Sequence, residues 1–106
     1  MFFSRTRSIT PTEAVERQRT GGLVLVDVRE AAELRQGRIE GARNIPLGQL
    51  GAQLGELDSS KSVAFVCQSG MRSARATKAA AKAGLDAVNV SGGVTAWSRA
   101  GLPLTR

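Results

Sequence analysis

The sequence contains no histidine and only one cysteine, and these two shortages exclude several kinds of site. A lone cysteine, Cys67, cannot form an internal disulfide bond. Zinc sites are built mainly from several cysteine and histidine ligands, so we expect no metal site and no cofactor. A single thiol also fits a reducing compartment, and we therefore predict a cytoplasmic location.

Aromatic residues are scarce as well, because the chain has three phenylalanines, one tryptophan and no tyrosine. Proteins that bind nucleic acids stack bases on aromatic rings and gather Lys and Arg on one face. The net charge is +6, but no basic run is longer than a pair, so we predict no nucleic-acid partner. The positive charge suits a small anionic substrate, or simply a solvated surface. No apolar run approaches the ~18 residues of a membrane span, and no secretory signal is visible.

The length of 106 residues fits one domain, which we place at residues 8–106 behind a flexible segment, residues 1–7. Apolar runs alternate with segments typical of helices. Strands are expected at residues 23–28, 63–66 and 86–90. Helices are expected at residues 11–19, 30–35, 73–83 and 94–100, with loose helical turns over 47–57. This alternation predicts an α/β fold with a mostly parallel central sheet and helices on both faces.

The first helix has clear start and stop signals. Thr10 is suited to cap it, Pro11 fits the first helical position, and Glu13 completes a capping box. The helix should end near Arg19, before a Gly-Gly pair. Its apolar face is thin, so we expect it to lie on the surface.

Two of the predicted strands end close to residues that carry chemistry, and ligand sites in parallel sheets lie at the carboxyl ends of strands. Asp27 lies near the end of the first strand, and Cys67 follows the second. We interpret Asp27 as a structural residue that binds the following turn or caps the next helix. A catalytic carboxylate is the alternative.

The loop after Cys67 predicts a reactive thiol. Cysteine is nucleophilic only as the thiolate, so a useful loop must lower the pKa of Cys67. The N-terminus of the following helix, main-chain N–H groups of residues 68–73 and the charge of Arg72 all favour an anion here. Gly70 allows a turn with positive φ, and Ser73 is expected to cap the helix. Without these features, a lone cysteine at a strand end would be a small buried hydrophobe.

Without histidine there is no obvious general base, so activation of Cys67 must be electrostatic. Attack of a thiolate on sulfur suits such a site, because the leaving group departs as a stable anion.

Four segments together resemble the single-domain rhodanese family of sulfurtransferases. They are Asp27-Val28-Arg29 with Glu30 after an apolar strand, residues 37–42 with 44–46, the loop 67–73, and residues 92–97 with 100–103. The resemblance covers about residues 8–104.

The resemblance implies that Cys67 accepts a sulfane sulfur from a small anionic donor such as thiosulfate, or from a persulfide. The resulting Cys67 persulfide would pass this sulfur to a thiol or to a protein acceptor. Asp27 and Arg29 would be structural supports. The substrate-binding residues would be those of the loop: Gln68, Ser69, Gly70, Met71, Arg72 and Ser73.

The chain departs from the family pattern at Arg38, where the family usually has histidine. Since this position is not the nucleophile, we expect activity to be retained. With no second cysteine the persulfide cannot be resolved as an internal disulfide, so the acceptor must be external.

Two alternatives to a sulfurtransferase are considered. A cysteine-dependent phosphatase or arsenate reductase places five residues between Cys and Arg, whereas this loop places four, residues 68–71. A non-catalytic module of the same fold, used for binding or regulation, is the other alternative. Inactive copies typically lack the cysteine, whereas Cys67 is present here with its full loop.

Overall fold

The computed structural model describes residues 7–106, and its centre is a five-stranded sheet with order β1-β5-β4-β2-β3. All neighbouring strands run parallel. The strands are β1 Ser8–Ile9, β2 Leu23–Asp27, β3 Arg43–Asn44, β4 Ser62–Val66 and β5 Ala87–Val90. The segment predicted to be flexible, residues 1–7, lies outside the described residues except for Arg7.

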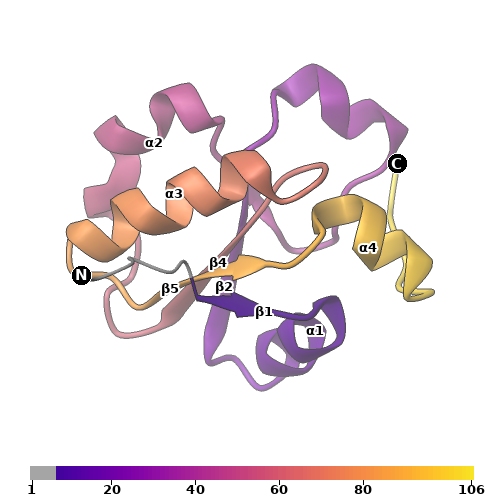
Figure 1. Cartoon of the computed structure of the whole chain (residues 1–106), viewed down its shortest axis with the longest axis horizontal. Coiled ribbons are helices and arrows are strands. Elements are labelled where there is room, and N and C mark those ends of the chain that lie inside the picture. Colours follow the sequence, from indigo (N-terminus) through magenta and orange to yellow (C-terminus); the bar gives the residue numbers. More distant parts are fainter. Residues whose placement is uncertain (1–6) are drawn as a thin grey trace, which may run out of the picture.

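Helices cover both faces of this sheet, as Figure 1 shows. The α-helices are α1 Pro11–Arg19, α2 Leu47–Gln53, α3 Met71–Lys82 and α4 Gly93–Arg99, and two short 3-10 helices are η1 Ala31–Gln36 and η2 Leu54–Glu56. In Figure 1, α2 and α3 lie above the sheet, whereas α1 and α4 lie on the other side of it. The predicted α/β fold with a parallel sheet between helical layers is therefore confirmed.

The strands are apolar on both sides because each side faces a hydrophobic core. Successive side chains of a strand point to opposite faces, so neighbours in β2 and β4 enter different cores. One core lies between the sheet and the helices α1 and α4. Its buried residues are Ile9, Ala14, Leu23, Leu25, Ile39, Ala64, Val66, Val88, Val90, Val94 and Trp97. The other core lies between the sheet and the helices α2 and α3. Its buried residues are Val26, Val28, Ile45, Leu50, Leu57, Val63, Phe65, Cys67, Ala76, Ala80 and Ala87. The Cys67 side chain thus packs in the second core, directly after the end of β4.

The first helix begins as the sequence predicts. The Glu13 N–H donates to the Thr10 hydroxyl at 3.1 Å, and the Thr10 N–H donates back to the Glu13 carboxylate at 3.1 Å. This reciprocal pair is the predicted capping box, and the helix ends at Arg19. Ala14 is its most buried side chain, in keeping with a thin apolar face.

Several boundaries differ from the prediction. Helix α3 begins at Met71, two residues before the predicted start, and its N-cap is Gly70 with φ 106°. The prediction that Ser73 caps this helix was therefore wrong, since Ser73 lies inside the first turn. The short edge strands β1 and β3 were not predicted, because two-residue strands leave too little alternation to recognise. Within residues 7–106, no helix combines the length and apolar character needed to cross a bilayer.

Candidate active site

Cys67 lies at the carboxyl end of the central strand of the sheet, directly after β4. Its side chain is buried, with only 1% of the residue exposed. The start of α4 holds the main chain here, because the Val94 N–H donates to the Cys67 carbonyl at 2.8 Å and the Thr95 N–H donates to the Gln68 carbonyl at 3.1 Å. Hydrogen bonds from the start of α4 therefore hold in place the main chain that carries the thiol.

Gly93 makes this close approach possible. A Cβ atom at this position would lie 2.3 Å from the Cys67 carbonyl oxygen and 2.6 Å from the Gln68 carbonyl oxygen. Its φ of +62° is also a conformation that glycine adopts more readily than any other residue. Gly93 is thus a contact residue of the reactive loop.

The loop places neutral hydrogen-bond donors around the sulfur. The Gly70 N–H donates to Cys67 Sγ at 3.1 Å, and the Ser73 hydroxyl lies 3.4 Å from Sγ. Burial raises the pKa of the Cys67 thiol, but the Ser73 hydroxyl and the N–H groups of Ser73, Gly70 and Ser69 outweigh it. The pKa of Cys67 is consequently lowered, which favours the thiolate.

Asn89, which was not among the predicted site residues, completes this arrangement. Its Oδ1 lies 2.6 Å from the Ser73 hydroxyl, and its Nδ2 donates to the Gly70 carbonyl at 3.2 Å. A hydroxyl has one proton, so Ser73 donates either to Asn89 or to the Cys67 sulfur. Asn89 therefore orients both the residue that caps α3 and the hydroxyl beside the thiol. The sequence did contain one signal for Asn89, because its amide side chain lies among the apolar residues of β5.

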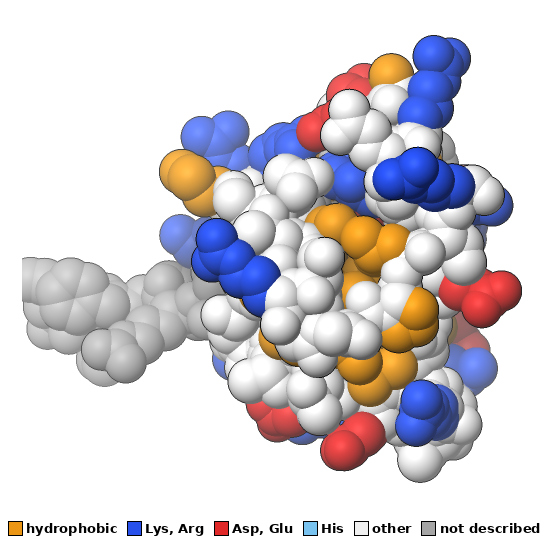
Figure 2. All heavy atoms as spheres, turned by 90° about the vertical axis from the view of Figure 1, so that its right-hand side faces the viewer, with side chains coloured by type: hydrophobic (Ala, Val, Ile, Leu, Met, Phe, Trp, Pro, Cys, Tyr) orange, Lys and Arg blue, Asp and Glu red, His pale blue; other side chains and the backbone are white. Residues whose placement is uncertain are grey.

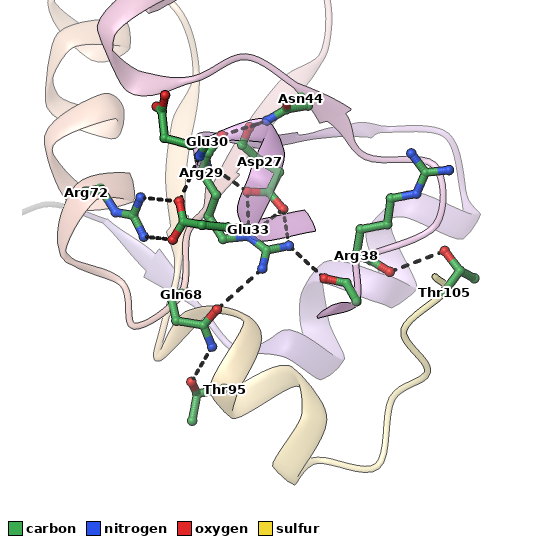
Figure 3. Close-up of polar contacts among 11 residues, drawn as sticks. Asp27, Arg29, Glu30, Glu33, Arg38, Asn44, Gln68, Arg72, Thr95 and Thr105 are labelled. Atoms are coloured by element: carbon green, nitrogen blue, oxygen red, sulfur yellow. Dashed lines mark hydrogen bonds and ion pairs between the residues drawn. The ribbon is translucent and has the colours of Figure 1, made fainter. Parts of the chain in front are cut away.

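Asp27 and Arg29 form a buried ion pair behind the loop, with both residues 1% exposed. The Arg29 Nη2 lies 2.8 Å from Asp27 Oδ2, and the Arg29 main-chain N–H donates to Asp27 Oδ1 at 3.0 Å. Arg29 also donates to the Gly37 carbonyl at 3.0 Å and to the Gln68 side chain at 3.4 Å (Figure 3). Asp27 thus binds the turn that follows its strand, and Arg29 connects this turn to the reactive loop.

Asn44 fixes the same turn from β3. Its Nδ2 donates to the carbonyl oxygens of Asp27 and Arg29, at 3.0 and 2.9 Å. Buried and partly buried hydrogen bonds therefore connect the segments at the carboxyl ends of β2, β3 and β4, which positions the loops that follow them.

Arg72, whose charge was predicted to favour an anion at Cys67, is paired in the structure. Its Nη1 and Nη2 donate to the two carboxylate oxygens of Glu33 in η1, at 2.7 and 2.9 Å (Figure 3). The hydrogen bond from Arg72 is the main reason why the pKa of Glu33 is lowered from 4.5 to about 2. Both side chains are about one-third exposed, at 36% and 35%. Arg72 is the only Lys, Arg, Asp or Glu residue among residues 67–73, and its charge is thus matched by that of Glu33.

The remaining loop residues form an uncharged rim. Met71 is 78% exposed, and Ser69 is also exposed. The Gln68 amide donates to the Thr95 hydroxyl at 3.0 Å, so it bridges from Arg29 to α4. Gln68 also belongs to a pocket of about 360 Å³ lined by Arg29, Gln36, Gly37, Gln68, Val94, Thr95, Ser98, Arg99 and Leu104. Figure 2, which views the side of the molecule where α4 lies, shows hydrophobic side chains in a recess with Lys and Arg around it.

Arg38, the departure from the family pattern, lies apart from the loop. Its main chain pairs with that of Thr105 through two hydrogen bonds of 2.8 Å. Its side chain points away from Arg29 and Gln68 in Figure 3 and is exposed. Arg38 therefore joins the C-terminal segment to the domain without adding a charge to the thiol's surroundings. Residues 7–106 also contain no group of three or more acidic or cysteine side chains arranged to hold a metal ion.

Comparison with known proteins gives consistent matches. A family model described as a rhodanese-like domain matches residues 10–100. The putative sulfurtransferase YtwF of Bacillus subtilis is 41% identical over 71% of this chain and 73% of its own length. A protein named sulfurtransferase from Allochromatium vinosum is 36% identical over 80% of both chains. The crystal structure of a rhodanese-related protein from Thermoplasma volcanium has a TM-score of 0.86 and 34% identity, covering 93% of this chain and 97% of that one.

Proposed function

The chain belongs to the rhodanese-like domain family, and we propose that it is a sulfurtransferase that carries a sulfane sulfur as a persulfide on Cys67. The observation that carries this proposal is the Cys67 thiol with its lowered pKa, 3.1 Å from the Gly70 N–H at a helix start. The names of the relatives in Bacillus subtilis and Allochromatium vinosum support the same reaction class.

The reaction has two displacement steps on sulfur. The Cys67 thiolate first attacks the outer sulfur of a donor, the donor's S–S bond breaks, and sulfite or a thiolate departs. An acceptor nucleophile then attacks the outer sulfur of the Cys67 persulfide, and the Cys67 thiolate is regenerated. Neither step needs a metal or a general base at Cys67, because the nucleophile is already a thiolate and both leaving groups are anions.

The loop residues have separate roles in this proposal. Main-chain N–H groups of Ser69, Gly70 and Ser73 stabilise the thiolate and then the persulfide. Gln68, Met71 and Arg72 form the entrance through which donor and acceptor approach. Asp27 and Arg29 support the loop from behind and do not contact the reacting sulfur.

The acceptor is an external thiol or a protein, because Cys67 is the only cysteine. This also supports activity in a reducing compartment, and we propose the cytoplasm, where small thiols are abundant.

Mass spectrometry of the intact protein after incubation with a sulfur donor tests the proposal. Wild-type protein should gain the mass of one sulfur atom, a thiol reductant should remove it, and Cys67→Ser should gain nothing. With thiosulfate or a persulfide as donor and cyanide as acceptor, thiocyanate should form only in the protein that retains Cys67. Failure of every donor to load Cys67 would instead favour a non-catalytic module. Cys67-dependent hydrolysis of an aryl phosphate would favour the phosphatase alternative.

A further inference from the structure

We propose that Glu33 determines the donor class: by neutralising Arg72, it makes the loop select an organic persulfide over the dianion thiosulfate. This inference rests on the proposed sulfurtransferase function and extends it to a specific residue outside the reactive loop. Glu33 accepts two hydrogen bonds from Arg72, at 2.7 and 2.9 Å, one at each carboxylate oxygen.

The charges around Cys67 cancel in pairs. Arg72 is paired with Glu33 at the entrance, and Arg29 is paired with Asp27 behind the loop. The other loop side chains, Gln68, Ser69, Met71 and Ser73, carry no charge. A donor that enters the loop therefore meets dipoles and no uncompensated cation of the loop.

Other arginines of the region lie in solvent. Arg35 and Arg75 are exposed, and Arg99 is an exposed residue of the neighbouring pocket. Charges in water act over about 8 Å at physiological ionic strength, so these side chains attract anions weakly and without geometric specificity. The carboxylate of Glu33, in contrast, lies at the entrance itself, where it cancels the attraction that Arg72 would exert on an arriving anion.

The two donor classes place different charges at this entrance. Thiosulfate brings two negative charges, and its sulfur transfer releases sulfite, which is again a dianion. An organic persulfide, R–S–SH, gives its outer sulfur to the Cys67 thiolate, so that Cys67–S–SH forms, the S–S bond of the donor breaks, and R–S⁻ leaves. A persulfide therefore needs less positive charge at the site than thiosulfate does.

The pocket next to the loop offers room for the organic part of such a donor. It shares Gln68 with the loop, and its volume of about 360 Å³ is far more than a small inorganic anion needs. Its lining includes the amide of Gln36, the hydroxyl of Ser98 and the apolar side chains of Val94 and Leu104, together with Arg29, which is paired with Asp27, and the exposed Arg99. The amide, hydroxyl and apolar groups suit the peptide part of an amide-containing thiol such as glutathione, and Arg99 suits a carboxylate of that organic part, away from the reacting sulfur.

Glu33→Gln tests the inference because the amide retains one acceptor for Arg72 and loses the charge. Glu16→Gln on the exposed face of α1 is the matched control, since it removes one negative charge on the opposite side of the sheet. Glu33→Asp keeps the charge. For each variant, kcat/KM would be measured with thiosulfate and with glutathione persulfide, using one acceptor and a physiological salt concentration.

Wild-type protein should prefer glutathione persulfide over thiosulfate. Glu33→Gln should raise kcat/KM for thiosulfate roughly tenfold, as removal of one charge a few ångströms from a dianion allows, and should change the persulfide value less. Glu33→Asp and Glu16→Gln should keep the wild-type donor ratio. The inference is wrong if wild type prefers thiosulfate, if Glu33→Gln leaves the ratio unchanged, or if both donors lose activity in parallel. If neither donor loads Cys67 in wild-type protein, the proposed function itself fails.

Discussion

Ser73→Ala should raise the pKa of the Cys67 thiol, because it removes a hydroxyl that lies 3.4 Å from Sγ. A hydrogen bond to a charged group contributes about 1.5–3 kcal/mol, and one pKa unit corresponds to about 1.4 kcal/mol, so the upper limit is about two units. The bond is long, and Asn89 competes for the same proton at 2.6 Å. We therefore expect a rise of about one unit, with the Gly70 N–H still in place.

The composition makes this titration simple to read. With one cysteine and no tyrosine in the chain, ultraviolet absorbance that appears on raising the pH reports the thiolate of Cys67 without interference from a phenolate. The rate of alkylation by iodoacetamide as a function of pH provides an independent measurement. An unchanged or lowered pKa would refute the reasoning, since main-chain donors alone would then set the protonation of the thiol.

Thr77→Val is the matched control for this experiment. Thr77 is buried one turn further along α3, and its hydroxyl donates to the Ser73 carbonyl at 2.8 Å. Its loss should destabilise the protein without moving the pKa of Cys67. Ser73→Ala should also destabilise, by about 1–3 kcal/mol, because the buried Asn89 Oδ1 is left without a donor. Both variants should thus lower the free energy of unfolding, but only Ser73→Ala should raise the pKa of Cys67.

Three further changes test the surroundings of the loop. Asp27→Asn should lower the free energy of unfolding by about 3 kcal/mol or more, measured in urea, because Arg29 is left as an uncompensated buried charge. Gly93→Ala should cost more than about 3 kcal/mol and impair sulfur loading, whereas Gly84→Ala, with open space around it, should cost only the positive-φ penalty of about 1–2 kcal/mol. Because the folded-state pKa of Cys67 lies below its unfolded value, the stability of wild type relative to Cys67→Ala should rise with pH, from the folded-state pKa to about 8.5. A flat difference across that range would contradict the lowered pKa.

The sequence predicted the framework of the fold because its signals are local. Strand-length apolar runs identified the central strands, and the capping box at Thr10 identified the start of α1. The location of Cys67 and Asp27 at one edge of the sheet followed from the topology, since parallel strands direct their carboxyl ends to the same edge. The edge strands were missed because a two-residue strand has too few residues to show alternation. The start of α3 was placed too late because its cap, Gly70, lacks the side chain that usually signals a helix start.

The partners of the loop could not be predicted, because they come from distant parts of the chain. Glu33 is 39 residues from Arg72, and Asn89 is 16 residues from Ser73. Periodicity indicates that a residue is buried or exposed, but it does not identify the residue across from it. Asn89 differed from its apolar neighbours, which was a usable signal, whereas Glu33 was one exposed-looking glutamate among several.

The pairing of Arg72 changes the explanation of how Cys67 is activated. Part of the stabilisation of the thiolate was predicted to come from the Arg72 charge, but in the structure that charge is matched by Glu33 at 2.7 Å. The donors at the sulfur are the Gly70 N–H and the Ser73 hydroxyl, which are neutral and held in place by α3 and Asn89. Neutral donors stabilise one anionic sulfur without attracting a second anion as strongly as a free cation would. In the proposed reaction, a thiolate acceptor approaches the Cys67 persulfide and takes its outer sulfur while the Cys67 thiolate is regenerated, so two anions meet at one entrance. Under that proposal, neutral dipoles would let the sulfur-loaded acceptor leave, whereas an unpaired arginine would hold it by charge.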